Sequence, residues 1–277
     1  MVSIHQLLQY IEEDAPSGDV TSEAVVPEVN CSAVIRAEQP GVIAGLEEAA
    51  ALFEYFHVVA EQRVRDGDGV NAGDEVLVLS GSAKMILLVE RTALNIIGRM
   101  SGIATQTRKM ADSIASVNPA CRVAGTRKTA PGSRALDKKA VLLGGGDPHR
   151  TSLSDGILIK DNHLALVPLE TAIRKARAVS AYRIIEVEVE TPEDAKKAAE
   201  AGSDIILLDN MSPEKIRAAV SLLRNHGLRD RVLLEVSGGV DENSLPAYAS
   251  CGVDTISMGA LTHTVKNFSV TLEIQPF

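Results

Sequence analysis

From residue 156 onward, segments typical of β-strands alternate with segments typical of α-helices, and this alternation restricts the fold more than any other feature of the chain. The expected strands are 156–159, 184–189, 205–208, 232–236 and 255–257. The expected helices are 168–179, 192–201, 213–225 and 243–250, and the first three begin with a proline, which suits the first helical turn. Parallel strands need long crossovers, so the alternation predicts a parallel sheet, either in a barrel or doubly wound.

The first hundred residues follow a different pattern. Apolar spacing predicts helices over 4–11 and 49–56, and short strands at 33–37, 41–44 and 75–79. The glycines of 66–74 do not fit a GxGxxG phosphate loop, so this segment is expected to be a β-turn. Segment 84–116 has a helical period, and Gly98 and Gly102 are the points where it could divide into two helices.

Composition excludes several classes of protein. The chain has 277 residues, 45% hydrophobic and 23% charged, which is typical of a globular protein with a sizeable core. Aromatic residues are only 3% and the net charge is -9, so a nucleic-acid partner is disfavoured. The three cysteines are far apart, so neither a disulfide framework nor a zinc site is expected. With no signal-peptide pattern and no long apolar stretch, we expect a soluble cytoplasmic protein that does not bind a membrane.

Potential ligands or glycines stand at the carboxyl end of five successive expected strands. They are Lys160 to His163, then Glu188 and Glu190, then Asp209 and Asn210, then Glu235 to Gly239, and then Gly259. In α/β barrels this end holds the active site, whereas residues at the other end mostly stabilise the fold. The placement therefore predicts an active site at the carboxyl ends of the strands.

Three glutamates alternate along one of these strands. Glu186, Glu188 and Glu190 should face the same side of a strand that is buried on both faces. Because an unpaired buried carboxylate is costly, each needs a partner. We expect Glu186 and Glu188 to pair with structural Lys or Arg, and Glu190, nearest the carboxyl end, to act in the site. Asp209 is also expected to act there, because Ser212 can cap the helix that follows.

Segment 122–150 reverses the sign of the chain, with seven Lys and Arg against two Asp. Such a patch in an acidic protein suggests a small polyanion held locally. Arg127–Lys128 and His149–Arg150 fall in irregular loops, where binding residues concentrate.

Lys138 and Lys139, by contrast, are expected on a solvated helix face. The chain has no Walker loop, GxSxG elbow or HExxH motif, so ATP hydrolysis, serine hydrolysis and zinc proteolysis are disfavoured. Cations together with carboxylates, which can hold Mg²⁺ or stabilise a developing positive charge, fit transfer chemistry on a polyanion.

Eight motifs together are similar to those of the quinolinate phosphoribosyltransferase family. They are ERTALN at 90–95, SGIAT at 101–105, TRKTAPGSR at 126–134, GGGDPHR at 144–150, LIKDNH at 158–163, LLDN at 207–210, EVSGG at 235–239 and SMGALTH at 257–263. They occur in the family's order over nearly the whole chain. Pro148 and Lys139 depart from the residues that are usual in relatives, Asn and Tyr.

The resemblance implies a fold and a reaction. The fold is an N-terminal α/β sandwich, residues 1–104 joined by 265–277, and an incomplete α/β barrel, residues 105–264, that carries the active site. The reaction joins quinolinate to phosphoribosyl pyrophosphate, with loss of pyrophosphate and CO₂, and gives nicotinate mononucleotide for NAD synthesis. It requires Mg²⁺, which Glu190, Asp209 and the donor phosphates would hold.

The resemblance also implies the site residues. Arg127, Lys128, His149, Arg150 and Lys160 would line the quinolinate pocket, and Arg91 would enter it from a neighbouring subunit of a homodimer or a larger assembly of dimers. The phosphoribosyl donor would contact Lys128, Lys160, Glu190, Asp209, Glu235, Ser237, Gly238, Gly259 and His263. Of these, Lys128, Lys160, Glu190 and Asp209 are the expected catalytic residues.

Three alternatives remain open at this point. The first is a paralogue of the same fold that is associated with molybdenum transport, against which the complete basic pocket argues. The second is a Schiff-base aldolase that uses Lys160. The third is a non-catalytic binding protein, which would not need carboxylates opposite the cations.

Overall fold

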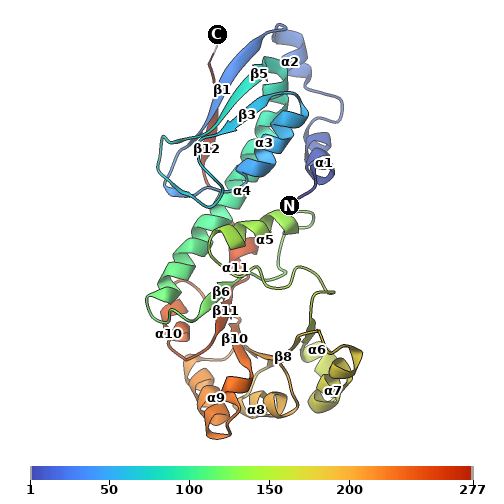
Figure 1. The fold of residues 1–277 in the computed structure, drawn as a ribbon, viewed down its shortest axis with the longest axis vertical. Coiled ribbons are helices and arrows are strands. Elements are labelled where there is room, and N and C mark those ends of the chain that lie inside the picture. The colour runs from blue at the N-terminus through green and yellow to red at the C-terminus, as the bar shows by residue number, and fades with distance from the viewer. Residues whose placement is uncertain (1, 276–277) are drawn as a thin grey trace. The chain divides into compact units, whose positions relative to one another are not determined.

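The computed structural model describes residues 2–275 and consists of two compact units (Figure 1). The first unit contains the described residues up to Arg108, the segment Thr129–Gly145 and the described residues from Thr264. The second contains Lys109–Lys128 and Gly146–His263. The sequence prediction assigned 129–145 to the barrel, whereas Leu136 and Ala140 of this segment pack in the core of the first unit.

The first unit is the predicted α/β sandwich. Its four-stranded sheet has the order β12-β1-β5-β3, and every neighbouring pair is antiparallel. Its helices are α1 (Ile4–Asp14), α2 (Val20–Val25), α3 (Leu46–Tyr55), α4 (Ala83–Ala115), which continues into the second unit, and α5 (Arg134–Leu143). Its strands are β1 (Asn30–Ala37), β3 (Val59–Gln62), β5 (Glu75–Ser82) and β12 (Val270–Gln275), with a separate pair β2 (Gly41–Val42) and β4 (Gly69–Val70).

Helix α4 is continuous, so the expected division at Gly98 and Gly102 is wrong. The two glycines make room for the returning C-terminal segment, because a Cβ on Gly102 would lie 2.3 Å from the carbonyl oxygen of Lys266. The backbone N–H of Phe268 donates to the carbonyl of Gly98 at 2.8 Å. These glycines therefore serve close packing rather than a break in the helix.

The solvated face expected for Lys138 and Lys139 is also wrong. Lys138 is buried, and the Lys139 ammonium lies 2.8 Å from a carboxylate oxygen of Glu48 and 3.3 Å from one of Asp66. These two acids are themselves buried, so Lys139 balances their charge inside the first unit.

The second unit is built on a six-stranded parallel sheet of order β6-β11-β10-β9-β8-β7, which confirms the predicted α/β architecture. Its strands are β6 (Arg122–Ala124), β7 (Ile157–Ile159), β8 (Ile185–Val189), β9 (Ile205–Asp209), β10 (Leu233–Ser237) and β11 (Thr255–Ser257). Strands β6 and β7 are the two ends of the sheet, so the barrel is incomplete, as predicted.

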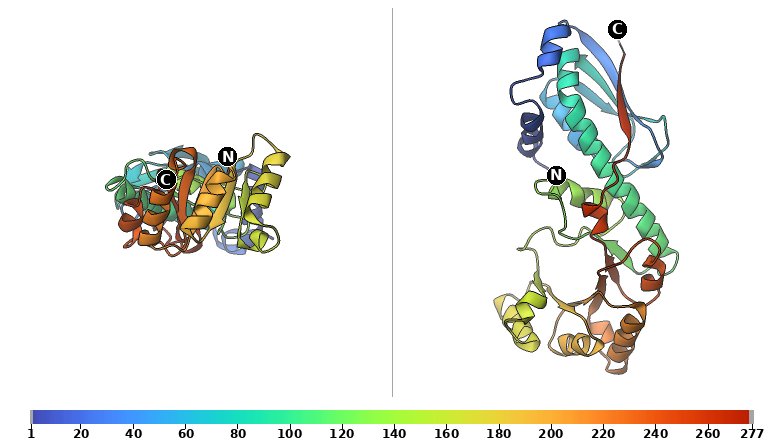
Figure 2. Two further views of the ribbon diagram at one scale, coloured as in Figure 1. Left: turned by 90° about the horizontal axis from the view of Figure 1, so that it is seen from below. Right: turned by 180° about the vertical axis from the view of Figure 1, so that it is seen from behind.

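With the exception of the last, the helices of the second unit lie in the crossovers between successive parallel strands. They are α6 (Asp161–Leu164), α7 (Leu169–Val179), α8 (Pro192–Glu200), α9 (Pro213–Asn225), the 3₁₀ turn η1 (Arg229–Arg231), α10 (Leu245–Ala249) and α11 (Ala260–His263). Figures 1 and 2 show α7, α8 and α9 side by side. The hydroxyls of Thr191 and Ser212 cap α8 and α9, each of which begins with proline.

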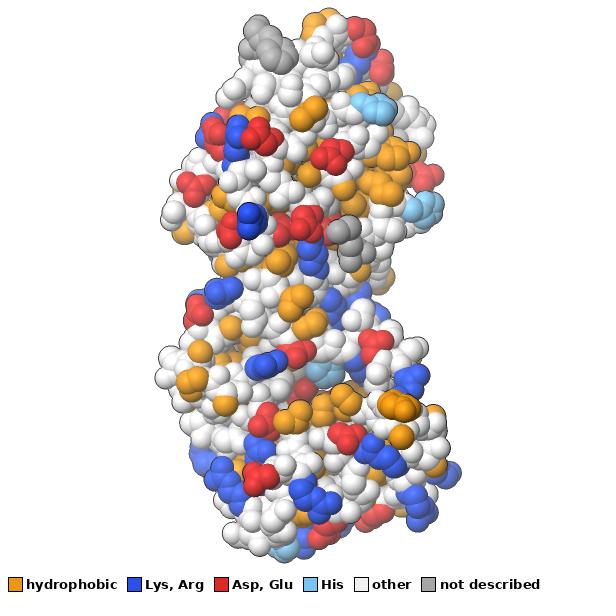
Figure 3. All heavy atoms as spheres, in the orientation of Figure 1, with side chains coloured by type: hydrophobic (Ala, Val, Ile, Leu, Met, Phe, Trp, Pro, Cys, Tyr) orange, Lys and Arg blue, Asp and Glu red, His pale blue; other side chains and the backbone are white. Residues whose placement is uncertain are grey.

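The surface is mixed in charge. Figure 3 shows Lys and Arg side chains interspersed with Asp and Glu over the visible face. No helix within residues 2–275 is both long enough and apolar enough to cross a membrane.

Candidate active site

A cavity of about 590 Å³ lies in the second unit, at the carboxyl ends of the parallel strands. This is the end at which α/β barrels carry their active sites. Nine of the residues that the sequence analysis selected line it: Arg127, Lys128, His149, Arg150, Lys160, Asp209, Glu235, Ser237 and Gly238.

Two loops bring the basic residues together. Residues Arg127 and Lys128 follow β6, and His149 and Arg150 follow the glycines at 144–146. Asp147 pairs with β6, because its N–H donates to the carbonyl of Val123 at 2.8 Å and its carbonyl accepts from Gly125. The second loop is thereby fixed beside the end of β6, which places four cationic side chains on one wall of the cavity.

The cationic wall is prepared for an anion. The Nε atom of Arg127 is buried and has no hydrogen-bond partner among the described residues. Burial and the neighbouring Arg127 lower the pKa of Arg150. A bound carboxylate or phosphate would offset both, because charge-assisted hydrogen bonds from guanidinium groups to such anions are strong.

Carboxylates line the same cavity from neighbouring strands. Glu188 of β8 accepts from the Lys160 ammonium at 2.6 Å, and Asp209 ends β9, where it accepts from the side chain of Asn210 at 2.7 Å. The expected alternation along β8 holds, since Glu186 and Glu188 lie on one face of the strand, but their partners are His149 and Lys160, which belong to the predicted site, and not structural Lys or Arg.

Glu190 lies elsewhere. It follows the end of β8, is exposed, and is not among the residues that line the cavity in the described part of the chain. At this end of β8 it is Glu188 that lines the cavity. The missed signal was the length of the strand: β8 ends at Val189, so the carboxylate at its mouth is Glu188.

Backbone conformation at the ends of β9 and β10 also shapes the cavity. Gly238 has a φ of +90°, and a Cβ there would lie 2.3 Å from Oδ1 of Asn210. The N–H of Asn210, whose own φ is +51°, donates to the carbonyl of Ser237 at 2.9 Å. Only glycine fits at position 238, and its backbone is therefore accessible to a ligand.

Gly259 and His263 lie beside Lys128. A Cβ on Gly259 would be 2.9 Å from Cδ of Lys128 and 3.0 Å from the ring of His263. The Thr262 hydroxyl donates to the carbonyl of Lys128 at 2.9 Å. The structure thus brings these predicted residues to one edge of the cavity, although Gly259 and His263 do not line it.

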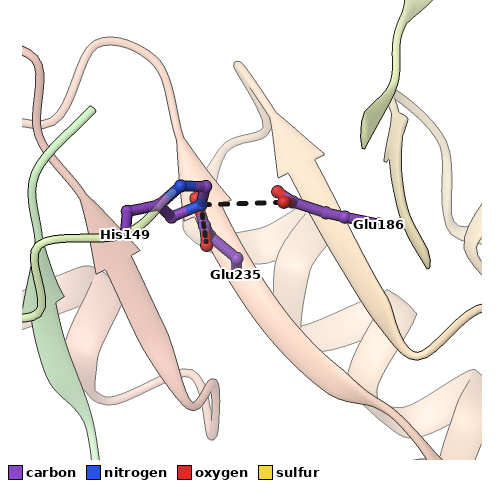
Figure 4. Close-up of side chains that lie close together, drawn as sticks. All are labelled: His149, Glu186 and Glu235. Carbon is purple, nitrogen blue, oxygen red and sulfur yellow. Dashed lines mark ion pairs between the residues drawn. The ribbon is translucent and has the colours of Figure 1, made fainter. Parts of the chain in front are cut away.

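His149 lies between two buried carboxylates (Figure 4). Its Nε2 atom is 3.3 Å from Glu235 Oε2 and 3.6 Å from Glu186 Oε2. Burial alone would lower the pKa of His149, but the two carboxylates outweigh burial and raise it to about 10. The sequence predicts a structural ion pair for Glu186, and its partner in the structure is His149.

Arg91 is the one predicted site residue in the first unit, where it is exposed on α4. It does not line the cavity of the second unit. Several residues that were not singled out do line it, among them Thr126, Leu158, Leu207 and Ser257.

An incomplete α/β barrel with a cationic wall facing carboxylates at its strand ends belongs to the class of barrel enzymes that act on small polyanions. Family models narrow this class: the quinolinate phosphoribosyl transferase N-terminal domain matches residues 19–101 and the C-terminal domain matches residues 103–273. The chain belongs to the quinolinate phosphoribosyltransferase family.

Individual relatives agree over the full length. The chain is 46% identical to the probable carboxylating nicotinate-nucleotide pyrophosphorylase of Methanothermobacter thermautotrophicus, over 96% of this chain and 97% of that one. It is 39% identical to the carboxylating enzyme of that name from Mycobacterium leprae, over 95% and 94%. The solved structure of nicotinate-nucleotide pyrophosphorylase from Francisella tularensis matches with a TM-score of 0.92 and 33% identity, covering 99% of this chain and 98% of that one.

Proposed function

We propose that this protein transfers the phosphoribosyl group of phosphoribosyl pyrophosphate to quinolinate and decarboxylates the product to nicotinate mononucleotide, in the de novo synthesis of NAD. The observation that carries the proposal is the cavity that Arg127, Lys128, His149 and Arg150 line together with Glu188 and Asp209. Family membership supports it, and it favours a phosphoribosyltransferase over an aldolase or a non-catalytic binding protein.

The cationic wall accounts for the substrate. Quinolinate has two adjacent carboxylates that repel each other, and guanidinium and ammonium groups relieve this repulsion while they fix the ring. Arg127, Arg150 and Lys160 are the groups in the cavity that suit this task, with His149 beside them. Nicotinate has one carboxylate and would leave part of the wall unpaired.

The carboxylates account for the transfer. As the bond between ribose C1 and pyrophosphate breaks, C1 gains positive charge, which Glu188 and Asp209 stabilise. The pyridine nitrogen then bonds to C1 and becomes cationic. When the adjacent ring carboxylate leaves as CO₂, its electron pair remains on the ring carbon beside the cationic nitrogen, and that carbon takes up a proton. This step needs no dedicated base.

Carboxylate oxygens are the ligands that Mg²⁺ prefers, and Glu188 and Asp209 supply them from adjacent strands of one cavity. We therefore propose Glu188, in place of Glu190, together with Asp209 and the donor phosphates, as the groups that would hold Mg²⁺. The ion would neutralise charge on the leaving pyrophosphate.

We further propose a cytoplasmic homodimer, or an assembly of such dimers, in which Arg91 of each chain completes the pocket of its neighbour. The exposure of Arg91 and its absence from the cavity of its own second unit support this arrangement.

The decisive experiment measures pyrophosphate release from the purified protein with phosphoribosyl pyrophosphate and Mg²⁺. Release should depend on quinolinate and should be accompanied by an equal amount of CO₂ and nicotinate mononucleotide. Comparable turnover with nicotinate in place of quinolinate would contradict the substrate assignment, and release without CO₂ would contradict the decarboxylation.

A further inference from the structure

Glu186 is buried behind the substrate cavity rather than within it. Its side chain comes from β8 and points toward His149, while Glu235 reaches the same histidine from β10 (Figure 4). Both glutamates are about 95% buried, with relative exposures of 5% and 4%. Glu186 does not line the 590 Å³ cavity, whereas His149 and Glu235 do.

A second cavity of about 320 Å³ lies on the other side of the histidine. Glu186, Glu235, His149 and Arg150 line it, together with apolar residues from the beginnings of the strands. His149, Arg150 and Glu235 line both cavities. The histidine therefore separates the substrate cavity from a second space in the barrel, and Glu186 contacts it from the far side.

The charge balance of this cluster favours a cation at His149. Two ionised carboxylates beside a neutral imidazole would be expensive to bury. Burial and the neighbouring Glu235 indeed raise the pKa of Glu186, whereas the hydrogen bond from His149 and the charge of Arg150 lower it. An imidazolium compensates one of the two carboxylates, and the Arg150 guanidinium adds attraction for both glutamates. Oxygen Oε1 of Glu186 has no hydrogen-bond partner among the described residues, so this carboxylate has little other support.

Other charged groups around His149 do not reverse this balance. The loop that carries His149 contributes Arg150 and Asp147, and the carboxylate of Asp147 accepts from the backbone N–H of His149 at 2.7 Å. The loop after β6 contributes Arg127. Asp155 is a further acid at the second cavity. The two arginines oppose a charge on the imidazole, but Glu186 and Glu235 lie within 3.6 Å of it and are buried with it.

The backbone of His149 is held in a costly conformation. Its φ is +55°, which is uncommon for a residue with a side chain. Such strain persists only where the surroundings fix it, and here Asp147 fixes the backbone while the two glutamates fix the ring.

We propose that Glu186 is a positioning residue, which together with Glu235 holds His149 as an oriented imidazolium and thereby makes it a permanent member of the cationic wall that receives the quinolinate carboxylates. This inference rests on the proposed function for the identity of the ligand, but the charge state of His149 does not depend on that identity. Glu186 itself touches no substrate and acts through the histidine.

The first test is direct. In protein with isotopically labelled histidine, NMR titration should show His149, assigned by the loss of its signal in His149→Asn, fully protonated from pH 6.5 to 8.5. In Glu186→Gln the ring should lose its proton at least two pH units lower than in the wild type, which is about a hundredfold loss of proton affinity. Glu188→Gln is the matched control: it removes a carboxylate of the same strand that does not contact His149, and it should leave the titration unchanged.

The second test connects the charge to binding. With the wild type, the KM for quinolinate should be nearly constant from pH 6.5 to 8.5. With Glu186→Gln it should rise at least threefold over this range and recover at the acid end, while kcat changes little. A role in stability alone would not produce a pH-dependent KM.

Three results would overturn the proposal: a neutral His149 in the wild type at pH 7.5, an unchanged titration and KM profile in Glu186→Gln, or stoichiometric binding of Zn²⁺ at the three side chains with displacement of the ring proton. The last deserves measurement because the donor atoms lie within 4.8 Å of one another. If the variant fails to fold, the wild-type titration still tests the proposal, because a neutral His149 at pH 7.5 would overturn it. Failure of the wild type to use quinolinate would instead contradict the proposed function and leave the titration result standing.

Discussion

The ammonium of Lys160 lies 2.6 Å from Oε2 of Glu188, and this ion pair joins the mouths of β7 and β8 at the cavity. The end of β7 thus supplies a cation, Lys160, that can contact a substrate anion. The end of β8 supplies an anion, Glu188, that can stabilise a developing positive charge beside it. The pair also distinguishes the two glutamates at the end of β8, because Glu190 lies beyond the strand and is exposed.

Replacement of Glu188 should therefore have a much larger effect than replacement of Glu190. Glu188→Gln should lower kcat by about 10²- to 10³-fold, the usual loss when one electrostatic contact to a transition state is removed. Glu190→Gln should retain at least half of the wild-type kcat. Steady-state kinetics with thermal unfolding as a check on the fold will measure this, and the reverse order of the two effects would return the role to Glu190.

Arg150→Ala should mainly weaken quinolinate binding. Loss of charge-assisted hydrogen bonds costs about 2–3 kcal/mol, which raises the Kd about 30- to 150-fold. Isothermal titration without the phosphoribosyl donor measures this binding alone. Arg122→Ala is the control, because Arg122 is exposed at the opposite end of β6, and its Kd should match the wild type. A Kd for Arg150→Ala within twofold of the wild type would remove Arg150 from the quinolinate pocket.

Asp209→Asn should change the response to Mg²⁺. The amide cannot supply the negative charge of the carboxylate, so the Mg²⁺ concentration for half-maximal rate should rise at least fivefold and kcat should stay low at saturating Mg²⁺. Chelation of the metal should abolish wild-type turnover reversibly. If Asp209→Asn reaches the wild-type kcat at high Mg²⁺, the proposed stabilisation of the transition state by Asp209 is incorrect.

Arg91→Ala and Lys160→Ala should each be nearly inactive, and a mixture of the two should regain activity. In symmetric dimers assembled at random, about half are heterodimers, and each has one of two sites intact, so about a quarter of the wild-type activity per subunit should return. Subunit exchange is verified by native mass spectrometry. Absence of recovery in exchanged, folded dimers would show that Arg91 does not complete a neighbouring pocket.

Gly102→Ala should destabilise the first unit, because its Cβ would lie 2.3 Å from the carbonyl oxygen of Lys266. We expect a loss of about 1–3 kcal/mol in the free energy of unfolding, as for other overpacked positions. Gly69→Ala is the matched control, since nothing lies within 4 Å of a Cβ there and its φ is not in the left-handed region. Urea unfolding of both variants makes the comparison, and equal stabilities would contradict the packing role.

Local patterns in the sequence predicted the second unit well, because the parallel strands and their proline-initiated helices depend on short-range spacing. The strand β12 and the close packing that explains the glycines of α4 were beyond such patterns, since both depend on contacts between residues remote in the chain, as between Gly98 and Phe268. The solvated position expected for Lys139 was wrong for the same reason, because its partners Glu48 and Asp66 are remote in sequence.

In the candidate site, too, the features set by local spacing were predicted and those set by long-range contacts were not. Parity along β8 correctly placed Glu186 and Glu188 on one face, but parity does not say where a strand ends, and the choice of Glu190 depended on that. The convergence of Glu186 and Glu235 on His149 requires the order of β8, β9 and β10 in the sheet, which residue spacing alone does not provide.

The pairing of β12 with β1 sets an order of events during synthesis. Strand β1 lies between β5 and β12, yet β12 is translated only after every residue of the second unit. While the ribosome completes the barrel, β1 therefore presents an unpaired edge, and the core of the first unit lacks Phe268. The unit whose synthesis begins first is therefore the last to complete its sheet. Until β12 is made, the exposed edge of β1 in the nascent chain is open to pairing with another molecule.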